Sequence, residues 1–513
     1  MKTSFNFKNF FLLLIFLFIF LPYVYLFFYL FFPNFKFVGL NSLAEYIQLI
    51  FSIRLFKILF RSLGIGIATA FTSTLVGLTL ALILECTDLP ASNLWKKLLF
   101  LPFLLPSYLF VFTWLGFLGK RGTFTTLTFP NIPINVYNPF FLIFFLTLCF
   151  FPFPMFLISL GLRNLNQNLI DAAKIYNSKK ILRLVLSLIF PHVLVAFFIT
   201  FSFVVSEYMV PSFLRINTYQ NEIFIQLATF YDVRKATFYS LPLLFIFSLT
   251  FLLMYKYFNQ NLYFSISSNF RRSLKIWRLT GFKKFLTYVF LIILLLLSIG
   301  IPAFVLIIES EGKFLSALTL ARWEFLNSIA LSFLSAFLVT CSAILILYFF
   351  SDRKILNLFI IFPLMIPSPL LAISLIVLTS SFFQQTFLPL LLAYLSRFLP
   401  FSLLISLPFF IQIQKNLFEA ARLSTSSSFK ILRKILFPLS KKSFLNSFIL
   451  VFILCFSEIL ITQLLIPPGF QTLALRIETL LHYGNYSFVA SLNLISLIFI
   501  LILYSILFKS ESL

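Results

Sequence analysis

Long apolar stretches alternate with short polar and basic loops along the whole chain. Each stretch reaches the length of about 20 residues that an α-helix needs to cross the hydrocarbon core of a bilayer. The pattern predicts twelve spans, at residues 10–32, 62–84, 98–118, 139–161, 188–210, 238–257, 285–308, 327–350, 356–380, 388–411, 444–466 and 487–508. The expected fold is therefore all-α, a polytopic membrane protein with about twelve transmembrane helices.

The distribution of positive charge predicts the orientation of these spans. Most of the 39 lysine and arginine residues lie in loops on one side of the predicted membrane. Because cytoplasmic loops carry an excess of Lys and Arg, this side is expected to be cytoplasmic. An even number of spans then places both termini in the cytoplasm. The first apolar run has no small-residue cleavage site after it and is interpreted as an uncleaved span.

Composition excludes several functional classes. With 61% hydrophobic and only 11% charged residues, the chain is not a soluble domain. A net charge of +24 would suggest nucleic acid as a partner of a soluble protein, but here the basic residues serve membrane orientation, and no nucleic-acid partner is expected. The four cysteines have no paired spacing, so neither a disulfide framework nor a cysteine metal site is expected.

Several unusual features occur twice and in the same order. One is a proline pair, in LLFLPFLLPSYL and again in LFIIFPLMIPSPL, and another is an acid in a Ser-Glu pair inside an apolar run. The repeated residues are Pro102 and Pro106, Pro363 and Pro367, Glu207 and Glu458. These repeats predict two parallel halves, residues 1–257 and 285–513, joined by a cytoplasmic linker at 258–284. Parallel repeats imply a pseudo-two-fold axis along the membrane normal with a pathway at the interface.

A third repeated feature is a charged, hydroxyl-rich loop. It reads DAAKIYNSKKILRLVLSLIFP at residues 171–191 and EAARLSTSSSFKILRKILFP at residues 419–438. Each copy begins with an acid and two alanines, breaks at small polar residues and resumes as a basic helix that ends at Phe-Pro. The pattern predicts a helix, a turn and a second helix at the membrane surface.

These two loops resemble the EAA loop of permease subunits of binding-protein-dependent ABC importers. The matching residues are Asp171, Ala172, Ala173 and Asn177 in the first copy, and Glu419, Ala420, Ala421 and Thr425 in the second. Asp171 replaces the usual Glu, and both copies lack the glycine that the family places at the turn. The resemblance implies that these residues couple the chain to ATPase subunits.

The whole chain resembles the branch of this family in which one polypeptide carries both halves, which includes ferric-iron and thiamine permeases. The ending PPGFQTLALRIETLLHYGNYSFVASLNL, from Pro467, is similar to the ferric-iron members. The resemblance implies the type I importer fold of two parallel six-helix repeats in a bacterial cytoplasmic (inner) membrane. It also implies two ATP-binding cassette subunits at the cytoplasmic face and an external substrate-binding protein, which agrees with outward loops too short to form a binding domain.

The chain itself is not expected to be an enzyme or to bind a cofactor. Gly119-Lys120 and Gly312-Lys313 lack the remaining residues of a phosphate-binding Walker A loop. No Ser/His/Asp or Cys/His constellation stands out from the sequence. ATP is therefore expected to bind to a partner subunit.

Glu207, Tyr208 and Glu458 are the candidate pathway residues. A carboxylate in hydrocarbon costs a few kcal/mol, so such acids usually face a cavity, a partner or a pathway. The alternatives are that each acid lies at the outer end of its span or bonds a neighbouring helix. The four repeated prolines are expected to kink spans that line the pathway, or simply to bend them. Arg397 is interpreted as a snorkelling or helix-pairing charge.

Ferric iron is the preferred substrate prediction, because a hard trivalent cation favours carboxylate or tyrosinate oxygens. Thiamine or another small solute remains an alternative, since two acids also suit an organic cation. A secondary transporter of the major-facilitator type is a further alternative. Such a protein would carry a Gly/Asp/Arg-rich motif between spans two and three, where this chain reads ECTDLPASNLWKK. A membrane enzyme would need clustered catalytic residues, which the sequence does not offer.

Overall fold

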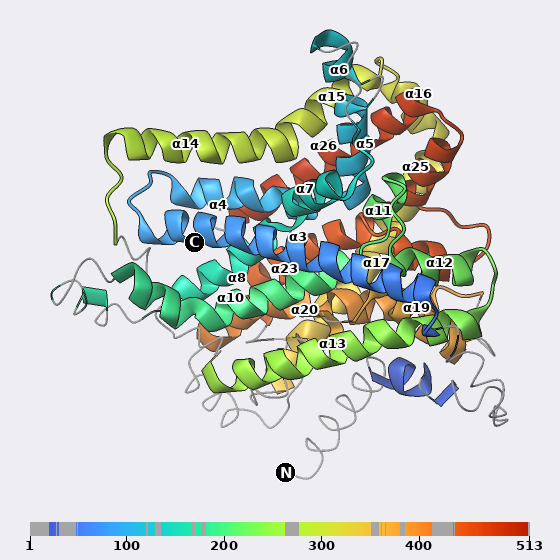
Figure 1. The fold of residues 1–513 in the computed structure, drawn as a ribbon, viewed down its shortest axis with the longest axis horizontal. Helices are drawn as coiled ribbons and strands as arrows, with labels where there is room; N and C mark the ends of the chain where they lie inside the picture. The colour runs from blue at the N-terminus through green and yellow to red at the C-terminus, as the bar shows by residue number, and fades with distance from the viewer. Residues whose placement is uncertain are drawn as a thin grey trace.

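The computed structural model shows a bundle of long helices whose axes run roughly across the view of Figure 1. It describes residues 20–26, 28–29, 48, 50–119, 122–128, 135–163, 165, 170–171, 173, 175, 181–261, 276–349, 356, 359–360, 362–364, 366–379, 385–412, 434 and 437–510. Within these residues there is no β-strand, and the β pairing consists of one isolated bridge between Thr87 and Trp277. The expected all-helical class is confirmed for this part of the chain.

The helices follow one another with short connections. In chain order they are α3 (Ile53–Cys86), α4 (Ser92–Phe100), the 3₁₀ helix η2 (Leu101–Leu104), α5 (Ser107–Leu118), α6 (Thr123–Thr128), α7 (Pro139–Phe150), α8 (Pro152–Arg163), α10 (Ile181–Val205), α11 (Met209–Phe213), α12 (Tyr219–Ala228), α13 (Val233–Asn261), α14 (Gly281–Leu295), the π-helix η4 (Leu296–Gly300), α15 (Ile301–Glu309), α16 (Phe314–Leu320), α17 (Arg322–Phe349), α19 (Ser368–Thr379), α20 (Leu388–Gln412), α23 (Phe437–Phe456), α24 (Leu460–Leu465), α25 (Leu473–His482) and α26 (Tyr486–Ser510).

Among the described residues, eight helices are long and apolar enough to cross a membrane, or up to ten if each of two bent pairs is one span. The expected count of twelve is therefore not confirmed. The predicted span 98–118 is a bent pair, with 90° between Ser92–Leu104 and Ser107–Thr125, and the predicted span 139–161 bends by 45° before Pro152. Proline explains such bends because it removes a helix N–H and clashes with the preceding turn. The predicted span 10–32 lies mostly outside the described residues.

Two groups of three helices form the centre of the bundle. In the first, α3 packs on α8 and α10, which also pack on each other. In the second, α17 packs on α20 and α23, and these two again pack on each other. The approach of α3 to α8 is close enough that a β-carbon on Gly77 would lie 2.7 Å from the backbone nitrogen of Met155. Each group combines a long unbroken helix with two helices that follow it in the chain.

The first and second parts of the chain are interleaved. The helix α15 packs on α5 as well as on α26, and α13 packs on α19. Phe20, in the helical segment before α3, stacks on Phe362 with ring centroids 4.3 Å apart. Helices from the first part of the chain therefore pack against helices from the second part, and neither part forms a separate body.

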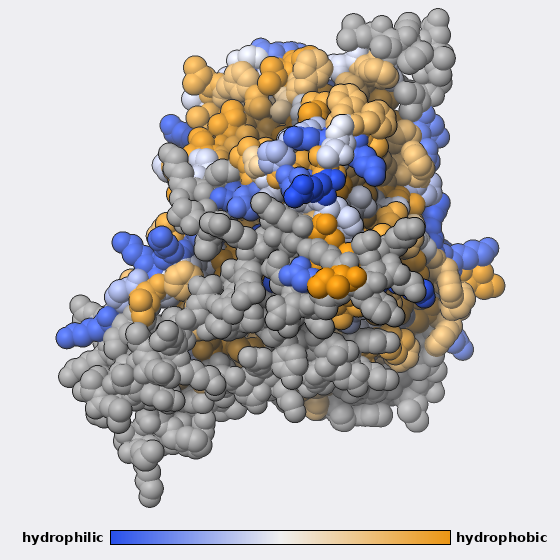
Figure 2. All heavy atoms as spheres, turned by 90° about the vertical axis from the view of Figure 1, so that its left-hand side faces the viewer, coloured by the Kyte–Doolittle hydropathy of each residue, from blue (hydrophilic) through white to orange (hydrophobic). Residues whose placement is uncertain are grey.

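The bundle has two different ends. The short helices α12, α16 and α25 lie at the right-hand end in Figure 1, and the start of α14 and the end of α26 lie at the left-hand end. Figure 2 faces the left-hand end, where hydrophilic residues gather in several patches among hydrophobic ones. The first turns of α14 contribute Lys283 and Lys284 there, and the start of α23 contains Lys441 and Lys442.

A buried ionic cluster ties three helices together near the start of the first loop. The side chain of Glu85, at the end of α3, is 1% exposed and lies 3.0 Å from Lys96 Nζ and 2.9 Å from Arg163 Nε. Arg163 is the last residue of α8, directly before the segment that contains Asp171. Burial of Glu85 is possible because both cations offset its lost hydration.

The end of the expected linker attaches to the α3–α4 connection. The backbone N–H groups of Ile276 and Trp277 both donate to Cys86 O, at 2.7 and 3.0 Å. The N–H of Leu279 donates to Asp88 Oδ1 at 2.7 Å. Since α13 runs to Asn261 and α14 begins at Gly281, helices extend into both ends of the expected linker at 258–284.

Candidate functional site

The acids of the two Ser-Glu pairs occupy equivalent breaks between helices. The helix α10 ends at Val205 and α11 begins at Met209, so Glu207 lies in the gap. In the same way α23 ends at Phe456 and α24 begins at Leu460, and Glu458 lies between them. The sequence predicted continuous spans through 188–210 and 444–466, so the acids lie just beyond the long helices rather than within them.

Each acid uses the same local contact to hold the short helix that follows. Glu207 Oε1 accepts from Met209 N at 3.1 Å, and Glu458 Oε1 accepts from Ile461 N at 3.3 Å. The first N–H groups of any helix have no partner within the helix, so a carboxylate placed there satisfies one of them. The two breaks are therefore built by a capping acid in each case.

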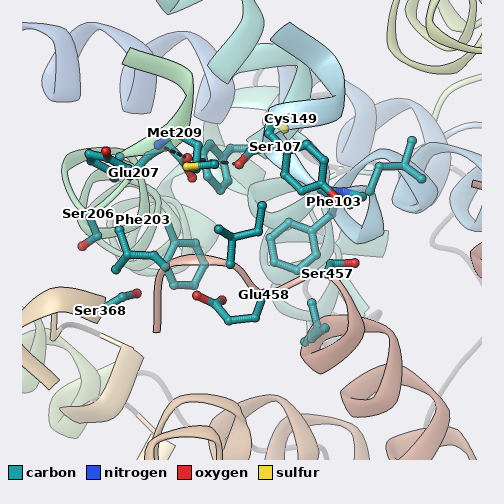
Figure 3. A pocket seen from close by; sticks show the side chains of 18 of the residues that line it. Phe103, Ser107, Cys149, Phe203, Ser206, Glu207, Met209, Ser368, Ser457 and Glu458 are labelled. Atoms are coloured by element: carbon teal, nitrogen blue, oxygen red, sulfur yellow. Dashed lines mark hydrogen bonds between the residues drawn. The ribbon is translucent and has the colours of Figure 1, made fainter. Parts of the chain in front are cut away.

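Both acids line one cavity of about 160 Å³. In Figure 3 Glu207 and Glu458 come from different segments of the chain and reach the cavity from opposite sides. The described residues that line it are Phe103, Leu104, Leu105, Pro106, Ser107, Tyr108, Cys149, Phe150, Phe203, Ser206, Glu207, Tyr208, Met209, Ser368, Arg397, Phe398, Phe401, Leu454, Ser457, Glu458, Ile459 and Leu460. The lining thus combines aromatic rings and a few hydroxyl groups with two acidic side chains and one basic side chain.

The two acids have different polar surroundings. Ser107 Oγ donates to Glu207 Oε1 at 3.0 Å, which Figure 3 marks together with the contact from Met209. Glu458 instead interacts electrostatically with Arg397. The Arg397 guanidinium donates to Ile366 O at 3.2 Å and lies 5.6 Å from the centre of the Phe203 ring. One acid is therefore held by a hydroxyl group and the other lies in the field of a cation.

The predicted pathway residues separate into two groups. Glu207, Tyr208, Glu458 and Pro106 line the cavity. The other three prolines do not. Pro102 is buried in η2, Pro363 is buried, and Pro367 lines a second, largely apolar cavity of about 370 Å³ beside Tyr23 and α13.

Arg397 and Ser107 are the functional candidates that the sequence reasoning missed. Arg397 was expected to snorkel or to pair helices; it donates to Ile366 O of a neighbouring segment, and its side chain also lines the cavity, which the sequence did not predict. A lone basic residue within the apolar run 388–411 was the available signal. For Ser107 the signal was the repeated Pro-Ser sequence, which places Ser107 after Pro106 and Ser368 after Pro367.

Most residues of the two predicted coupling loops lie outside the described part of the chain. These are Ala172, Asn177, Glu419, Ala420, Ala421 and Thr425. Asp171 is exposed, and Ala173 packs against the main apolar core. The structure therefore places the beginning of the first loop on the bundle, and the coupling role of both loops stays a prediction.

A much smaller cavity, of about 10 Å³, adjoins the first on the side of α25. The two share Tyr108, Met209 and Ile459, and α25 adds Ile477 and Glu478 to the smaller one. Burial raises the pKa of Glu478 to about 7, although a weak contact from Gln463 Nε2 at 3.5 Å opposes this effect. Glu478 thus lines a small cavity on the side of α25 that shares three lining residues with the main cavity.

In the described part of the chain, no group of three or more His, Cys, Asp or Glu residues is placed to hold a metal ion. Two carboxylates, hydroxyl groups and aromatic rings around a small space suit transient contact with a polar or charged solute. Ionisable groups placed this way among membrane helices typically mark a solute pathway.

The fold and the site together define the class of a polytopic helical membrane protein with a charged cavity among its spans. Residues 339–510 match the family model described as "Binding-protein-dependent transport system inner membrane component". The match includes Arg397, Glu458 and the entire second loop around Glu419. It supports a permease component of binding-protein-dependent ABC transport, in the inner membrane, with a substrate-binding protein and an ATPase as general partners. A comparison with curated proteins gave no match.

Proposed function

We propose that this chain is the transmembrane permease of an ATP-driven importer, with both halves in one polypeptide. The observation that carries the proposal is the family match over residues 339–510. Extension to the first half rests on the repeated architecture. Both parts of the chain have a three-helix group and an acid that caps a short helix after a break.

The proposed orientation places α12 and α25 outside, where a binding protein delivers its cargo. The opposite end, with the loops that begin at Asp171 and Glu419, faces the cytoplasm and two ATP-binding cassette subunits. The positive charge at the starts of α14 and α23 supports this orientation, because Lys and Arg favour the cytoplasmic side. ATP is then bound and hydrolysed on the partner subunits, and this chain needs no cofactor.

Ferric iron is the proposed cargo, and the size of the cavity favours it over thiamine. A pocket for a drug-sized organic molecule is usually about 300 Å³ or larger, whereas this cavity has about 160 Å³. Since a water molecule occupies roughly 30 Å³, the cavity has room for a metal cation and a few waters. The carboxylates of Glu207 and Glu458 supply oxygen atoms that a hard cation prefers.

The proposed mechanism is alternating access. ATP binding closes the two ATPase subunits, and the loops around Asp171 and Glu419 pass this movement to the helices. The two halves then rock about their common axis, so that the cavity between Glu207 and Glu458 opens outward to accept cargo. After hydrolysis the cavity opens inward and releases the cargo to the cytoplasm.

Reconstitution tests this proposal directly. The chain is purified with the ATPase encoded by a neighbouring gene and inserted into vesicles. ATP hydrolysis and uptake are then measured with candidate binding proteins loaded with ferric iron or thiamine. We expect stimulation and uptake with the ferric-iron-loaded protein. If only the thiamine-loaded binding protein stimulates ATP hydrolysis and uptake, ferric iron is not the cargo. Uptake that needs an imposed proton or sodium gradient and no ATPase overturns the importer and supports a secondary transporter.

A double charge reversal tests the coupling loops. Asp171→Lys combined with Glu419→Lys places positive charge at the first position of both loops, and we expect loss of ATPase association and of transport. The matched control is Asp88→Asn, which changes the charge of another acid near the same end of the bundle. Normal transport and association in the double variant contradict the coupling role.

A further inference from the structure

The helices α12 and α25 occupy the same structural position in the two parts of the chain. The first N–H of α12, from Tyr219, donates to Ser62 Oγ of α3 at 2.7 Å, and the first N–H of α25, from Leu473, donates to Ser328 Oγ of α17, also at 2.7 Å. A shared anchor at the first residue sets a common register along the two helices.

This register places different residues beside the main cavity. The sixth residue is Phe224 in α12 and Glu478 in α25. The Phe224 ring lies 4.0 Å, centroid to centroid, from the ring of Tyr208, which lines the main cavity. Glu478 lines the small adjoining cavity together with Tyr108. At this position the first half has two aromatic rings in contact, tilted by 33°, and the second half has a carboxylate.

Glu478 is not neutralised by an ion pair within the described residues. The fourth residue of α25, Arg476, is paired with Glu324 of α17 at 3.6 Å, and Lys313 at the same end of the bundle is paired with Glu311. Glu478 Oε1 accepts a long hydrogen bond from the uncharged amide of Gln463, at 3.5 Å. In its ionised form, a half-buried carboxylate without a cation creates a negative potential that attracts positive solutes.

We infer that Glu478 is a specificity-determining residue, which selects a multivalent cation at the narrow outer passage before it reaches Glu207 and Glu458. The inference rests on the proposed function, because it assigns α25 to the outer side and a cation to the pathway. This passage corresponds to the small cavity beside Glu478, which shares Tyr108, Met209 and Ile459 with the main cavity, so a cation at Glu478 lies next to residues that line the space of the two deeper acids.

The test measures iron uptake and ATP hydrolysis in the same vesicles, with the partner ATPase and a binding protein loaded with ferric iron. The variants are Glu478→Gln, which removes the charge at nearly constant shape, and Glu478→Asp, which retains it. The matched control is Glu311→Gln, an acid at the same end of the bundle whose side chain is 61% exposed and paired with Lys313. Thermal unfolding of each variant in detergent monitors packing.

For Glu478→Gln we expect about a tenfold fall in iron transported per ATP hydrolysed, since a charged cleft raises the encounter rate of an attracted ion by about tenfold or more. Glu478→Asp should recover most of this loss, and Glu311→Gln should match the wild type. Unfolding temperatures should stay equal, because a structural defect would lower both uptake and stability.

Two outcomes overturn the inference while the proposed function stands. One is a wild-type ratio of iron to ATP in Glu478→Gln, and the other is an equal loss in Glu478→Gln and Glu478→Asp together with lowered unfolding temperatures. Wild-type vesicles that show no ATP-driven iron uptake overturn the proposed cargo and the inference together.

Discussion

The breaks after α10 and α23 have the same backbone plan and different electrostatics. Glu207 and Glu458 both cap the short helix that follows. Around Glu207 the additional partner is the Ser107 hydroxyl group, whereas Glu458 lies in the field of Arg397. The difference teaches that the repeated architecture fixes where the acids stand, while single side chains from neighbouring helices decide how much negative charge each acid presents.

The helices α12 and α25 show the same division between shared geometry and divergent charge. Both α12 and α25 are anchored at their first residue by a serine of a long helix earlier in the chain, Ser62 of α3 and Ser328 of α17 respectively. The ion pairs one turn later have opposite polarity, since Glu222 of α12 meets Arg54 of α3 and Arg476 of α25 meets Glu324 of α17. The backbone anchors repeat, and the polarity of the side-chain pairs does not.

Among the substitutions that test the difference between the two breaks, removal of Arg397 should have the largest effect on stability and uptake. Arg397→Met removes the basic side chain that lines the cavity with Glu458. Removal of a cation that offsets the charge of a buried carboxylate costs up to about 3 kcal/mol, so we expect a fall in the free energy of unfolding, measured in detergent, and loss of uptake. For Ser107→Ala we expect a smaller loss of about 1.5 kcal/mol, because one hydrogen bond to a charged group is removed.

A double variant separates charge from packing at Arg397. Arg397→Met combined with Glu458→Gln removes both charges, and most of the lost stability should return because no uncompensated carboxylate remains. If the double variant is no more stable than Arg397→Met alone, the contribution of Arg397 lies in its contacts with Ile366 and Phe203, and the electrostatic contrast between the two breaks is wrong.

The sequence predicted the acids more successfully than the geometry around them. An acid in an apolar run is conspicuous because its burial is costly, so Glu207 and Glu458 could be selected without a structure. The break beside each acid could not be predicted, since hydropathy is the same for one continuous span and for a long helix followed by a short one. Arg397 was missed as a cavity residue because the rotation of α20 about its axis depends on packing against α17 and α23.

Substitution of either anchoring serine should lower the free energy of unfolding by a similar, intermediate amount. Ser62→Ala and Ser328→Ala each remove the acceptor of the first N–H of α12 or α25. Loss of such an acceptor costs about 1 kcal/mol, and we expect similar decreases in the free energy of unfolding and faster amide exchange at the starts of α12 and α25. The control is Thr79→Ala, because this exposed hydroxyl group bonds only to Leu75 O of its own helix. Clearly unequal losses would show that the two anchors are not equivalent.

Substitutions in the two ion pairs of opposite polarity should change the free energy of unfolding least. A charge swap tests this expectation. Arg54→Glu places two carboxylates opposite each other and should cost about 1 kcal/mol or less, because the side chain of Arg54 is 74% exposed and water screens the pair. Arg54→Glu combined with Glu222→Arg gives the first half the polarity of the second and should recover the wild-type unfolding free energy. If the double variant recovers its unfolding free energy at low salt and less of it at high salt, an ion pair of either polarity stabilises this position. If the swapped pair stays as unstable as Arg54→Glu alone, then the buried surroundings of residue 222 require a carboxylate, and the charge pattern of α12 and α25 is part of the architecture rather than a variation on it.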